Sequence, residues 1–289
     1  MAYTVEQAEI RGLDIDKMIK GFALTTYVFK SMVTVSSTSG DSIRWYQETA
    51  ADLTLVSPSK FETSPLSQFE TAEVSWTRNT SYPKKYAVEG TISREDIKGA
   101  DIDVLARTIL RLTRAVVKQV DSRIYDVMSD TQGTGSAGVG TGAATGDGWD
   151  DTTNGNPVID IMKGLQNIAE NDYDTSGCIV AMDPNNYTDL LNYLITVKGS
   201  SIPQFASDKV QTGVVGTLLG CKLVVSNNVV ADSVYVGLPA KSTTWKSFED
   251  IHAETENILG KGTRIAVWEN GEAILTDPKA SYVITDTNT

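Results

Sequence analysis

The most regular hydrophobic pattern of the chain lies between residues 101 and 128. Apolar residues recur there every three or four positions and, at about 100° per residue, fall on one side of a helix. These residues are Leu105, Ile109, Leu112, Val116 and Val120. Ser93, with Asp96 three positions later, resembles a capping box ahead of this run. We predict a helix of roughly 40 Å, at 1.5 Å per residue.

The opposite side of this predicted helix carries a row of four basic residues, which we call the basic stripe. Its members are Arg107, Arg111, Arg114 and Lys118. No acidic residue occurs between Val104 and Val120, so no carboxylate one turn away balances these charges. The whole chain is acidic, with 25 Lys and Arg against 37 Asp and Glu and a net charge of −12. The stripe therefore predicts a contact with acidic groups of another subunit or with phosphate, and a merely solvated face is the alternative.

The first hundred residues show strand patterns and little that can form a core. Residues 1–41 hold a short helical pattern and a β-rich run at 25–29, and they predict an extended arm that lies along something else. Strands are predicted at 43–48, 72–77 and 86–92, with turns rich in Ser, Thr and Pro between them. Since an isolated hairpin is marginal in water, this long two-stranded excursion predicts packing on another chain. The apolar residues expected at that interface are Trp45, Tyr46, Phe61, Phe69 and Trp76.

A glycine-rich stretch, residues 133–148 with seven glycines, follows the predicted helix. Residues 133–138 match the spelling G-x-G-x-x-G of dinucleotide-binding loops. That mechanism needs a strand before the glycines and a helix after them, whereas here a helix precedes and more Gly, Ala and Thr follow. We therefore predict no cofactor at this loop. The nearby Asp147, Asp150 and Asp151 fit no calcium-loop template and predict an exposed acidic turn.

The second half of the chain alternates helices and strands. Asn156-Pro157 and Asp183-Pro184 each supply an N-cap followed by a first-turn proline, so helices are expected after both. Strands are expected at 178–182, 222–226, 233–238, 264–268, 273–275 and 282–284. A turn is predicted at residues 269–271, because Asn-Gly favours hairpin turns. The elements together predict an α+β fold.

The composition argues against several classes of enzyme and metal site. The chain has 289 residues, and its two cysteines, Cys178 and Cys221, each lie in an apolar run, which predicts buried, reduced thiols. The chain has a single histidine, His252. This excludes a metal site with several histidines and most pairs of a nucleophile with a histidine base. Composition therefore argues against a hydrolase or a metalloenzyme, and we predict no catalytic residues, cofactor or metal. No apolar run is long enough to span a membrane and the start lacks a signal-peptide pattern, so a cytoplasmic protein is expected.

The order of these elements resembles the major capsid proteins of tailed phages and related archaeal viruses, which have the Hong Kong 97-type fold. The motifs that carry the resemblance are residues 84–96 before the long helix, the Gly-Thr-Gly loop, and Met182-Asp183-Pro184-Asn185-Asn186-Tyr187. Residues 216–226 and 270–280 resemble the later motifs of that family. The likeness spans roughly residues 40–285. Each motif alone occurs in many protein families, but their order and spacing together make the resemblance specific.

The resemblance implies a division of the chain into four parts. Residues 1–41 would be the N-terminal arm and 42–98 the E-loop, a β-hairpin that lies over a neighbouring subunit. Residues 99–156 would form the peripheral domain, with the long helix as its spine and the glycine-rich loop. Residues 157–289 would form the α/β axial domain, with some C-terminal strands returning to the peripheral domain. The spine helix would face the inside of a shell.

The resemblance also implies partners. Hexamers and pentamers of one chain would form an icosahedral virion shell, assembled in the host cytoplasm, around double-stranded DNA bound without sequence specificity. A portal, a separate scaffolding protein and a decoration protein are further expected partners; a membrane is not. Some relatives crosslink an E-loop lysine to a neighbouring asparagine, for which Lys60, Lys84 and Lys85 are available, although ordinary surface lysines are the simpler interpretation. The alternatives are an encapsulin-like nanocompartment and a nucleotide-binding α/β enzyme.

Overall fold

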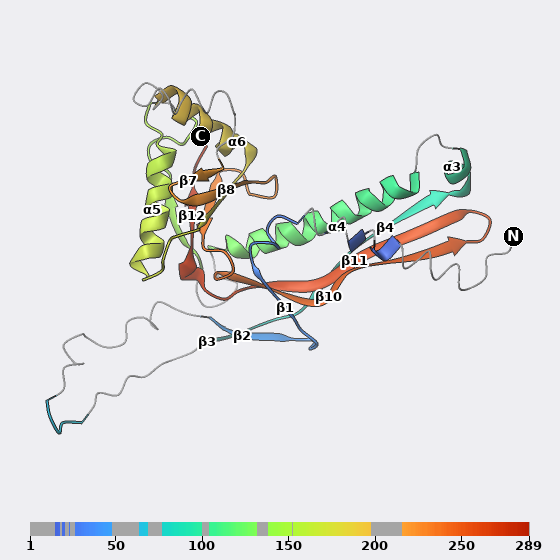
Figure 1. Ribbon diagram of the computed structural model, residues 1–289, viewed down its shortest axis with the longest axis horizontal. Helices are drawn as coiled ribbons and strands as arrows, with labels where there is room; N and C mark the ends of the chain where they lie inside the picture. The colour runs from blue at the N-terminus through green and yellow to red at the C-terminus, as the bar shows by residue number, and fades with distance from the viewer. Residues whose placement is uncertain are drawn as a thin grey trace. The chain divides into compact units, whose positions relative to one another are not determined.

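The structure consists of two compact units, each assembled from separate stretches of the chain (Figure 1). Unit 1 falls within residues 1–43, 81–125 and 245–274, and unit 2 within residues 44–80, 126–244 and 275–289. The computed structural model describes residues 15–17, 19–20, 23, 27–47, 64–68, 77–99, 104–131, 138–151, 153–197 and 216–288.

Unit 1 is a four-stranded sheet with a long helix packed on it. The strand order is β1 (Thr34–Ser37), β10 (Thr243–Ile258), β11 (Gly262–Leu275), β4 (Lys84–Ser93). Strands β4 and β11 pair antiparallel over the whole length of β4, from Gly262 opposite Ser93 to Gly271 opposite Lys84. A Cβ on Gly90 would lie 3.2 Å from the Leu112 methyl groups, so the missing side chain allows β4 to approach the helix closely.

The long predicted helix is confirmed as α4 (Val104–Met128), and its apolar side is buried at Ile109, Val116 and Val120. The capping interaction at Ser93 also forms, because its hydroxyl accepts a 3.0 Å hydrogen bond from the Asp96 amide. It belongs, however, to a separate short helix, α3 (Arg94–Gly99). Ser93 therefore caps α3, and the spine helix begins later in the chain.

The predicted turn at residues 269–271 is wrong, because β11 runs without interruption through these positions. The reason lies in the packing at Gly271. A Cβ there would lie 2.6 Å from the Trp245 ring and 2.7 Å from the Lys246 carbonyl oxygen. The glycine permits close approach of β10 rather than a reversal of the chain. The long strand β10 itself was not predicted from the sequence.

A separate two-stranded sheet is formed by β2 (Ile43–Gln47) and β3 (Thr77–Ser81). The first predicted strand of the excursion is confirmed by β2. Of the second predicted strand, 72–77, only its last residue falls within β3, and residues 72–76 lie outside the described part of the chain.

Unit 2 contains a mixed six-stranded sheet and two helices, each of which begins with a proline directly after its N-cap residue. The helices are α5 (Pro157–Glu170) and α6 (Pro184–Asn192), the latter continuing as the π-helix η2 (Tyr193–Val197). Both predicted N-caps form: Asn156 accepts from the Ile159 amide at 3.3 Å and Asp183 from the Asn186 amide at 3.0 Å. The strand order is β5 (Gly140–Ala143), β12 (Ser281–Thr285), β9 (Ser233–Gly237), β6 (Ile179–Met182), β8 (Cys221–Val225), β7 (Thr217–Leu218), and a 3-10 turn, η3 (Pro278–Ala280), precedes β12.

Part of the glycine-rich stretch is a strand rather than a loop. Residues Gly140–Ala143 form β5, which pairs parallel with β12 so that Gly140 lies opposite Tyr282. A Cβ on Gly142 would lie 2.1 Å from the Tyr282 hydroxyl oxygen. The glycines here give room to an aromatic side chain of the neighbouring strand.

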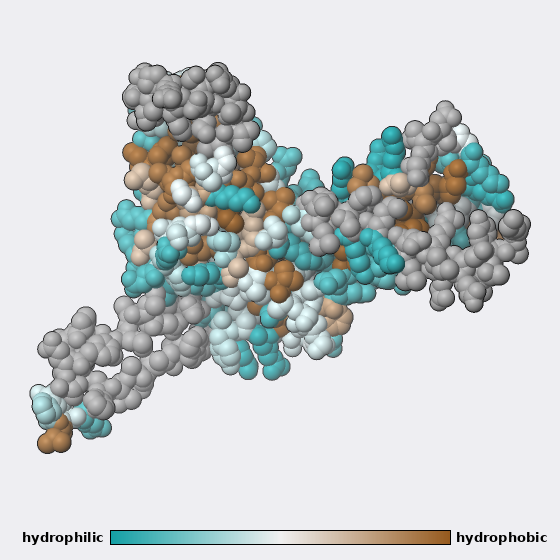
Figure 2. Space-filling view, in the orientation of Figure 1, coloured by the Kyte–Doolittle hydropathy of each residue, from teal (hydrophilic) through white to brown (hydrophobic). Residues whose placement is uncertain are grey.

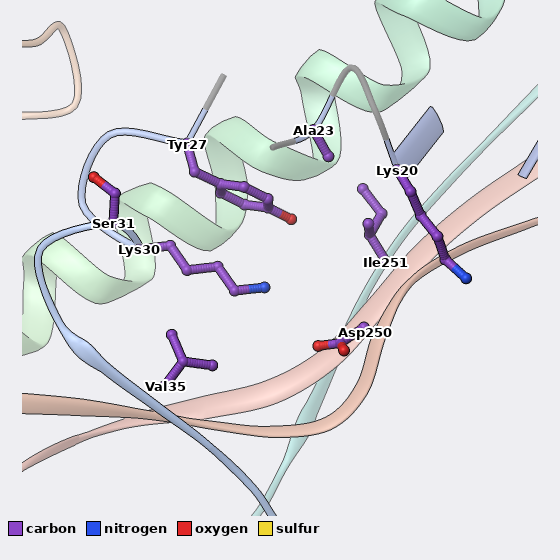
Figure 3. Close-up of a pocket in the computed structure, with 8 residues that line it drawn as sticks. All are labelled: Lys20, Ala23, Tyr27, Lys30, Ser31, Val35, Asp250 and Ile251. Carbon is purple, nitrogen blue, oxygen red and sulfur yellow. The ribbon is translucent and has the colours of Figure 1, made fainter. Parts of the chain in front are cut away.

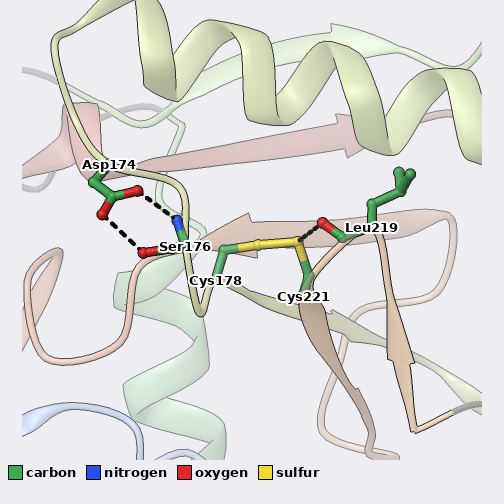
Figure 4. The surroundings of a disulfide bond; sticks show 5 residues. All are labelled: Asp174, Ser176, Cys178, Leu219 and Cys221. Atoms are coloured by element: carbon green, nitrogen blue, oxygen red, sulfur yellow. Dashed lines mark hydrogen bonds between the residues drawn. A yellow bond between two sulfur atoms is a disulfide. The ribbon is translucent and has the colours of Figure 1, made fainter.

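The two cysteines form a disulfide, which corrects the prediction of reduced thiols (Figure 4). Strands β6 and β8 are parallel neighbours with Ile179 opposite Lys222, and this register also places Cys178 beside Cys221. Their Cα atoms are 4.6 Å apart and both side chains are fully buried. The prediction failed because the two positions are 43 residues apart and only the strand pairing brings them together.

Candidate interaction surfaces

The basic stripe lies on the solvent-facing side of α4. All four members, Arg107, Arg111, Arg114 and Lys118, are exposed. Within the described residues, no carboxylate forms an ion pair with any of them. From Arg107 to Lys118 the stripe extends about 16 Å along the helix axis. It is a continuous cationic surface that the described part of its own chain does not neutralise.

Arg123, on the apolar side of the same helix, has a different environment. Its guanidinium contacts Glu272 of β11 through Nη2 at 2.6 Å and donates a hydrogen bond from Nε at 2.7 Å. The Glu272 side chain has no exposed area, and the Lys84 ammonium lies 3.4 Å from its other oxygen. Arg123 thus neutralises a buried acid. No local pattern marks Glu272, which directly follows the predicted turn at residues 269–271.

A second buried contact ties the N-terminal segment to α4 and β11. The Asp121 carboxylate accepts hydrogen bonds from the backbone amides of Val28 at 2.7 Å and Lys30 at 3.1 Å. The Tyr27 hydroxyl donates to Glu269, and the Lys30 ammonium lies 2.5 Å from the other Glu269 oxygen. We call Asp121, Glu269 and Glu272 the buried acid cluster.

Burial shifts the pKa of two groups here, Asp121 and Tyr27. It raises the pKa of Asp121 above the ordinary value, against the lowering effect of the backbone amides that it accepts from. The pKa of Tyr27 is raised, first by burial and then by the charge of Glu269.

Phe29, which is fully buried, packs against Tyr125 with 5.2 Å between ring centres. The predicted arm thus lies, at residues 27–30, on its own chain.

A pocket of ≈ 530 Å³ lies beside this contact in unit 1 (Figure 3). In Figure 3 the Lys30 ammonium and the Asp250 carboxylate both point into it from opposite walls. Its lining residues are Lys20, Ala23, Tyr27, Lys30, Ser31, Val35, Asp250 and Ile251.

The residues predicted for the excursion interface differ in exposure. Trp45 is buried within its own chain and donates from Nε1 to the Leu275 carbonyl oxygen at 3.0 Å. Tyr46, on the other face of β2, is 58% exposed. Phe61, Phe69 and Trp76 lie outside the described residues. A role of this set in an interface stays a prediction.

The three candidate crosslink lysines are also separated. Lys84 faces Glu272, and the Lys85 ammonium lies over the Trp268 ring, 4.6 Å from its centre. Lys60 is outside the described residues, as are residues 132–137 of the glycine-rich loop.

In the described stretches of the chain, no group of three or more His, Cys, Asp or Glu residues could hold a metal ion. No helix among the described residues is long and apolar enough to cross a membrane.

Unit 2 presents apolar side chains to solvent. Figure 2 shows them gathered over α5, β7 and β8. Exposed apolar patches of this kind mark contacts with other proteins. The large exposed apolar residues of unit 2 include Ile159, Met162, Leu219, Val225 and Val230.

Comparison with known proteins decides the family. The model of the phage capsid protein family matches residues 79–284, which is most of the chain. The chain belongs to the phage capsid protein family. It is therefore a capsid shell protein, a structural protein of the virion. No curated protein is similar enough in sequence to be matched to this capsid protein.

Solved structures with a similar fold are also capsids and particles. The protein of Mycobacterium phage Che8 is 15% identical, with 91% of this chain and 92% of that chain covered and a TM-score of 0.65. The capsid of cyanophage P-SCSP1u is 15% identical over 91% and 89%, with a TM-score of 0.63. The virus-like particle from Pyrococcus furiosus is 12% identical over 95% and 99%, with a TM-score of 0.63. This capsid protein therefore has the α+β Hong Kong 97-type fold.

Proposed function

We propose that this capsid protein assembles as hexamers and pentamers into a closed icosahedral shell around double-stranded DNA. Membership of the phage capsid protein family carries the proposal. The exposed apolar residues of unit 2 and the exposed Tyr46 supply surfaces for contacts between copies. The E-loop, residues 42–98, lies over a neighbouring subunit in this arrangement.

In the proposed shell the basic stripe faces the DNA. A chain of net charge −12 repels nucleic acid as a whole, so any attraction has to come from a local cationic surface. The stripe is such a surface, because its four side chains are exposed and no described carboxylate pairs with them. Contacts of this kind reach phosphates and carry no base specificity.

We further propose that the shell contains a portal, is built with a separate scaffolding protein and binds a decoration protein. The proposal also includes assembly in the host cytoplasm. None of these is tied to a particular residue of the chain, so co-expression with neighbouring viral genes tests them directly.

The test of the proposed function is expression of the chain, alone and with a scaffold, followed by negative-stain microscopy and nuclease digestion. We expect closed particles, and nuclease-protected double-stranded DNA in particles made in infected cells. A compact monomer at every concentration and salt condition, even with the scaffold, would overturn the shell.

A second candidate is a shell around a protein cargo. The fold is similar to that of a virus-like particle from Pyrococcus furiosus, which makes a shell that is not a virion the second candidate. The contents of purified particles separate the two functions, since a cargo shell would contain an enzyme and no protected DNA.

A further inference from the structure

The disulfide of unit 2 lies near one edge of the six-stranded sheet. In the order β5-β12-β9-β6-β8-β7, the bond joins Cys178, directly before β6, to Cys221, the first residue of β8. On its other side β8 pairs only with the two-residue strand β7, where Leu218 lies opposite Cys221. Within the described part of the chain, no strand lies beyond β7. One short strand thus separates the Cys221 end of the bond from the edge of the sheet.

Strands β7 and β8 form a hairpin whose two-residue turn is Leu219 and Gly220. Both turn residues have a left-handed backbone, with φ of 54° and 81°. Such turns favour Asn followed by Gly, because a leucine is unfavourable at a positive φ. Leu219 is also 46% exposed, so packing offsets little of this cost. A short edge hairpin with an unfavourable turn is the kind of element that opens locally while the rest of a domain stays folded.

Both sulfur atoms are inaccessible while this hairpin is closed. Cys178 and Cys221 have no exposed area and belong to the apolar core of unit 2, together with Val180 and Leu190. Thiols and disulfides exchange only when an attacking sulfur reaches them, so neither a reductant nor an oxidant acts on the closed hairpin. Without unfolding of unit 2, the redox state of the pair therefore changes only when β7 and the turn move away from Cys221.

We propose that Cys178 and Cys221 form a redox latch on the β7–β8 hairpin, open as two thiols in the cytoplasm and closed as the disulfide in released particles. The inference rests on the proposed assembly of the shell in the host cytoplasm. The thiol pool of a cytoplasm keeps the cysteines of newly made chains reduced, and folding then buries them as thiols. After release no such pool reverses oxidation, so a bond that forms during an opening of the hairpin persists.

The closing step needs an oxidant, for which a small-molecule disulfide such as oxidised glutathione suffices. The Cys221 thiolate, nearer the edge, attacks one sulfur of the oxidant, and one glutathione thiolate leaves. The Cys178 thiolate then attacks Cys221 Sγ in this mixed disulfide, and the second glutathione thiolate leaves. In total the two cysteine thiols lose two electrons and two protons, and the oxidant becomes two thiols.

The latch secures apolar residues that we assign to contacts between copies. Leu219 lies in the turn and Val225 at the end of β8, and both are exposed. When the bond is closed, the start of β8 cannot separate from the start of β6, which limits how far these two side chains can move. We therefore expect released particles to become more resistant to dissociation as the bond forms.

The first measurement counts free thiols in cells that produce particles. Cells are quenched in acid, the chains are denatured without reductant, and thiols are labelled with a maleimide of high mass that shifts the band on a gel. Because the chain has no cysteine outside the pair, we expect two labelled cysteines per chain in the cell. Released particles incubated with oxidised glutathione should show none. Chains that are already unlabelled inside the cell, or particles that stay reduced after release, overturn the latch.

The second measurement tests the hairpin as the gate, in unassembled subunits purified in reductant. In Gly220→Ala the new Cβ meets no atom within 4 Å but stands at φ 81°, so the change loosens the turn without a clash. We expect oxidised glutathione to consume its thiols roughly fivefold faster than those of the wild type, or more. Leu219→Asn supplies the favoured Asn-Gly turn and should slow the reaction by a similar factor.

Gly260→Ala is the matched control for Gly220→Ala. Gly260 has a φ of 71°, a Cβ there also meets no atom within 4 Å, and it lies in the turn between β10 and β11 of unit 1. Its thiols should react at the wild-type rate. If neither Gly220→Ala nor Leu219→Asn changed the rate, or if Gly260→Ala changed it equally, the hairpin would not be the gate.

The third measurement is the dissociation of particles in rising urea, followed by light scattering before and after oxidation. Wild-type particles kept reduced under nitrogen are one reference, and particles of Cys178→Ala with Cys221→Ala are the other. Only the oxidised wild type should gain resistance. No gain in the wild type, or an equal gain in the double variant, removes the role of the latch in the shell. The proposed shell itself fails on a different result, the absence of wild-type particles.

Discussion

At the scale of single residues, the buried acid cluster departs most from ordinary behaviour. Asp121, Glu269 and Glu272 are each at most 2% exposed, as is Asp160 of unit 2, whereas most other carboxylates in the described residues are exposed or half-buried. Each has a specific partner, namely backbone amides for Asp121 and cationic side chains for the two glutamates. Buried charges are tolerated when they are paired and hydrogen-bonded, and removal of one partner is costly.

Arg123→Met tests this cost. It leaves Glu272 buried with only the Lys84 ammonium nearby, and we expect a loss of about 3 kcal/mol in the free energy of unfolding, measured by chemical denaturation of unassembled subunits. Adding Glu272→Gln should restore part of that loss, because the uncompensated charge is then gone. Equal loss in the single and the double variant would contradict an ion pair between the two residues.

Asp121 predicts a pH dependence. Its pKa is higher in the folded chain than the ordinary 3.8, so the folded state holds the proton more tightly than the unfolded state. The contribution to stability is therefore fully present below pH 3.8 and is lost as the pH rises through the folded pKa. In Asp121→Asn this contribution disappears, and melting temperatures measured from pH 3.5 upward, at steps of about half a pH unit, should show a flatter profile than the wild type. Parallel profiles would exclude Asp121 as the source.

At the scale of elements, α4 carries charges on two sides. Asp121 and Arg123 make buried contacts within unit 1, whereas the basic stripe is exposed. Arg111→Ala with Lys118→Ala should leave the subunit folded, because alanine favours helices, and weaken DNA retention most visibly at raised salt. Nuclease-protected DNA is measured across a salt titration, with circular dichroism as the folding check. The matched control is Lys98→Ala with Lys261→Ala, which removes two exposed cations elsewhere. If the double variant retained as much DNA as the wild type, the stripe would be only a solvated face of the helix.

The disulfide gives an element-scale prediction in unit 2. Closing a loop of 43 residues restricts the unfolded chain and is worth roughly 4 kcal/mol in the loop-entropy model. Reduction under denaturing conditions followed by refolding in reductant should lower the melting temperature, whereas the variant Cys178→Ala with Cys221→Ala should not respond to reductant. A melting temperature unaffected by reductant in the wild type would contradict the contribution of the bond.

At the scale of the whole molecule, the two tryptophans of the excursion separate folding from assembly. Trp45 is buried by its own chain, so Trp45→Ala should cost the unassembled subunit about 3 kcal/mol or more. Trp76 is predicted to meet a neighbour, so Trp76→Ala should reduce particle yield far more than it lowers subunit stability. Light scattering measures the yield and thermal melting the stability. Equal losses in both assays for Trp76→Ala would place that residue in the core of its own subunit.

The sequence was sufficient where the determining interactions are local. The periodicity of α4 and the caps at Asn156 and Asp183 lie within a few residues of the elements that they define, and all were predicted. The disulfide, the uninterrupted β11 and the buried Glu272 depend on pairing between distant strands, which no local pattern encodes. The basic stripe was found because an unbalanced row of charges is visible without tertiary structure.

The contacts of Glu269 with Tyr27 join residues 242 positions apart, and unit 1 draws on three stretches of the chain that end only near residue 274. On the ribosome, at ~5–20 residues per second, synthesis from residue 125 to residue 245 takes on the order of ten seconds. During this interval the first two stretches have been made but the strands that complete their sheet have not. A nascent chain therefore cannot display a finished unit 1, and lattice contacts made through that unit begin only with subunits whose translation is nearly complete.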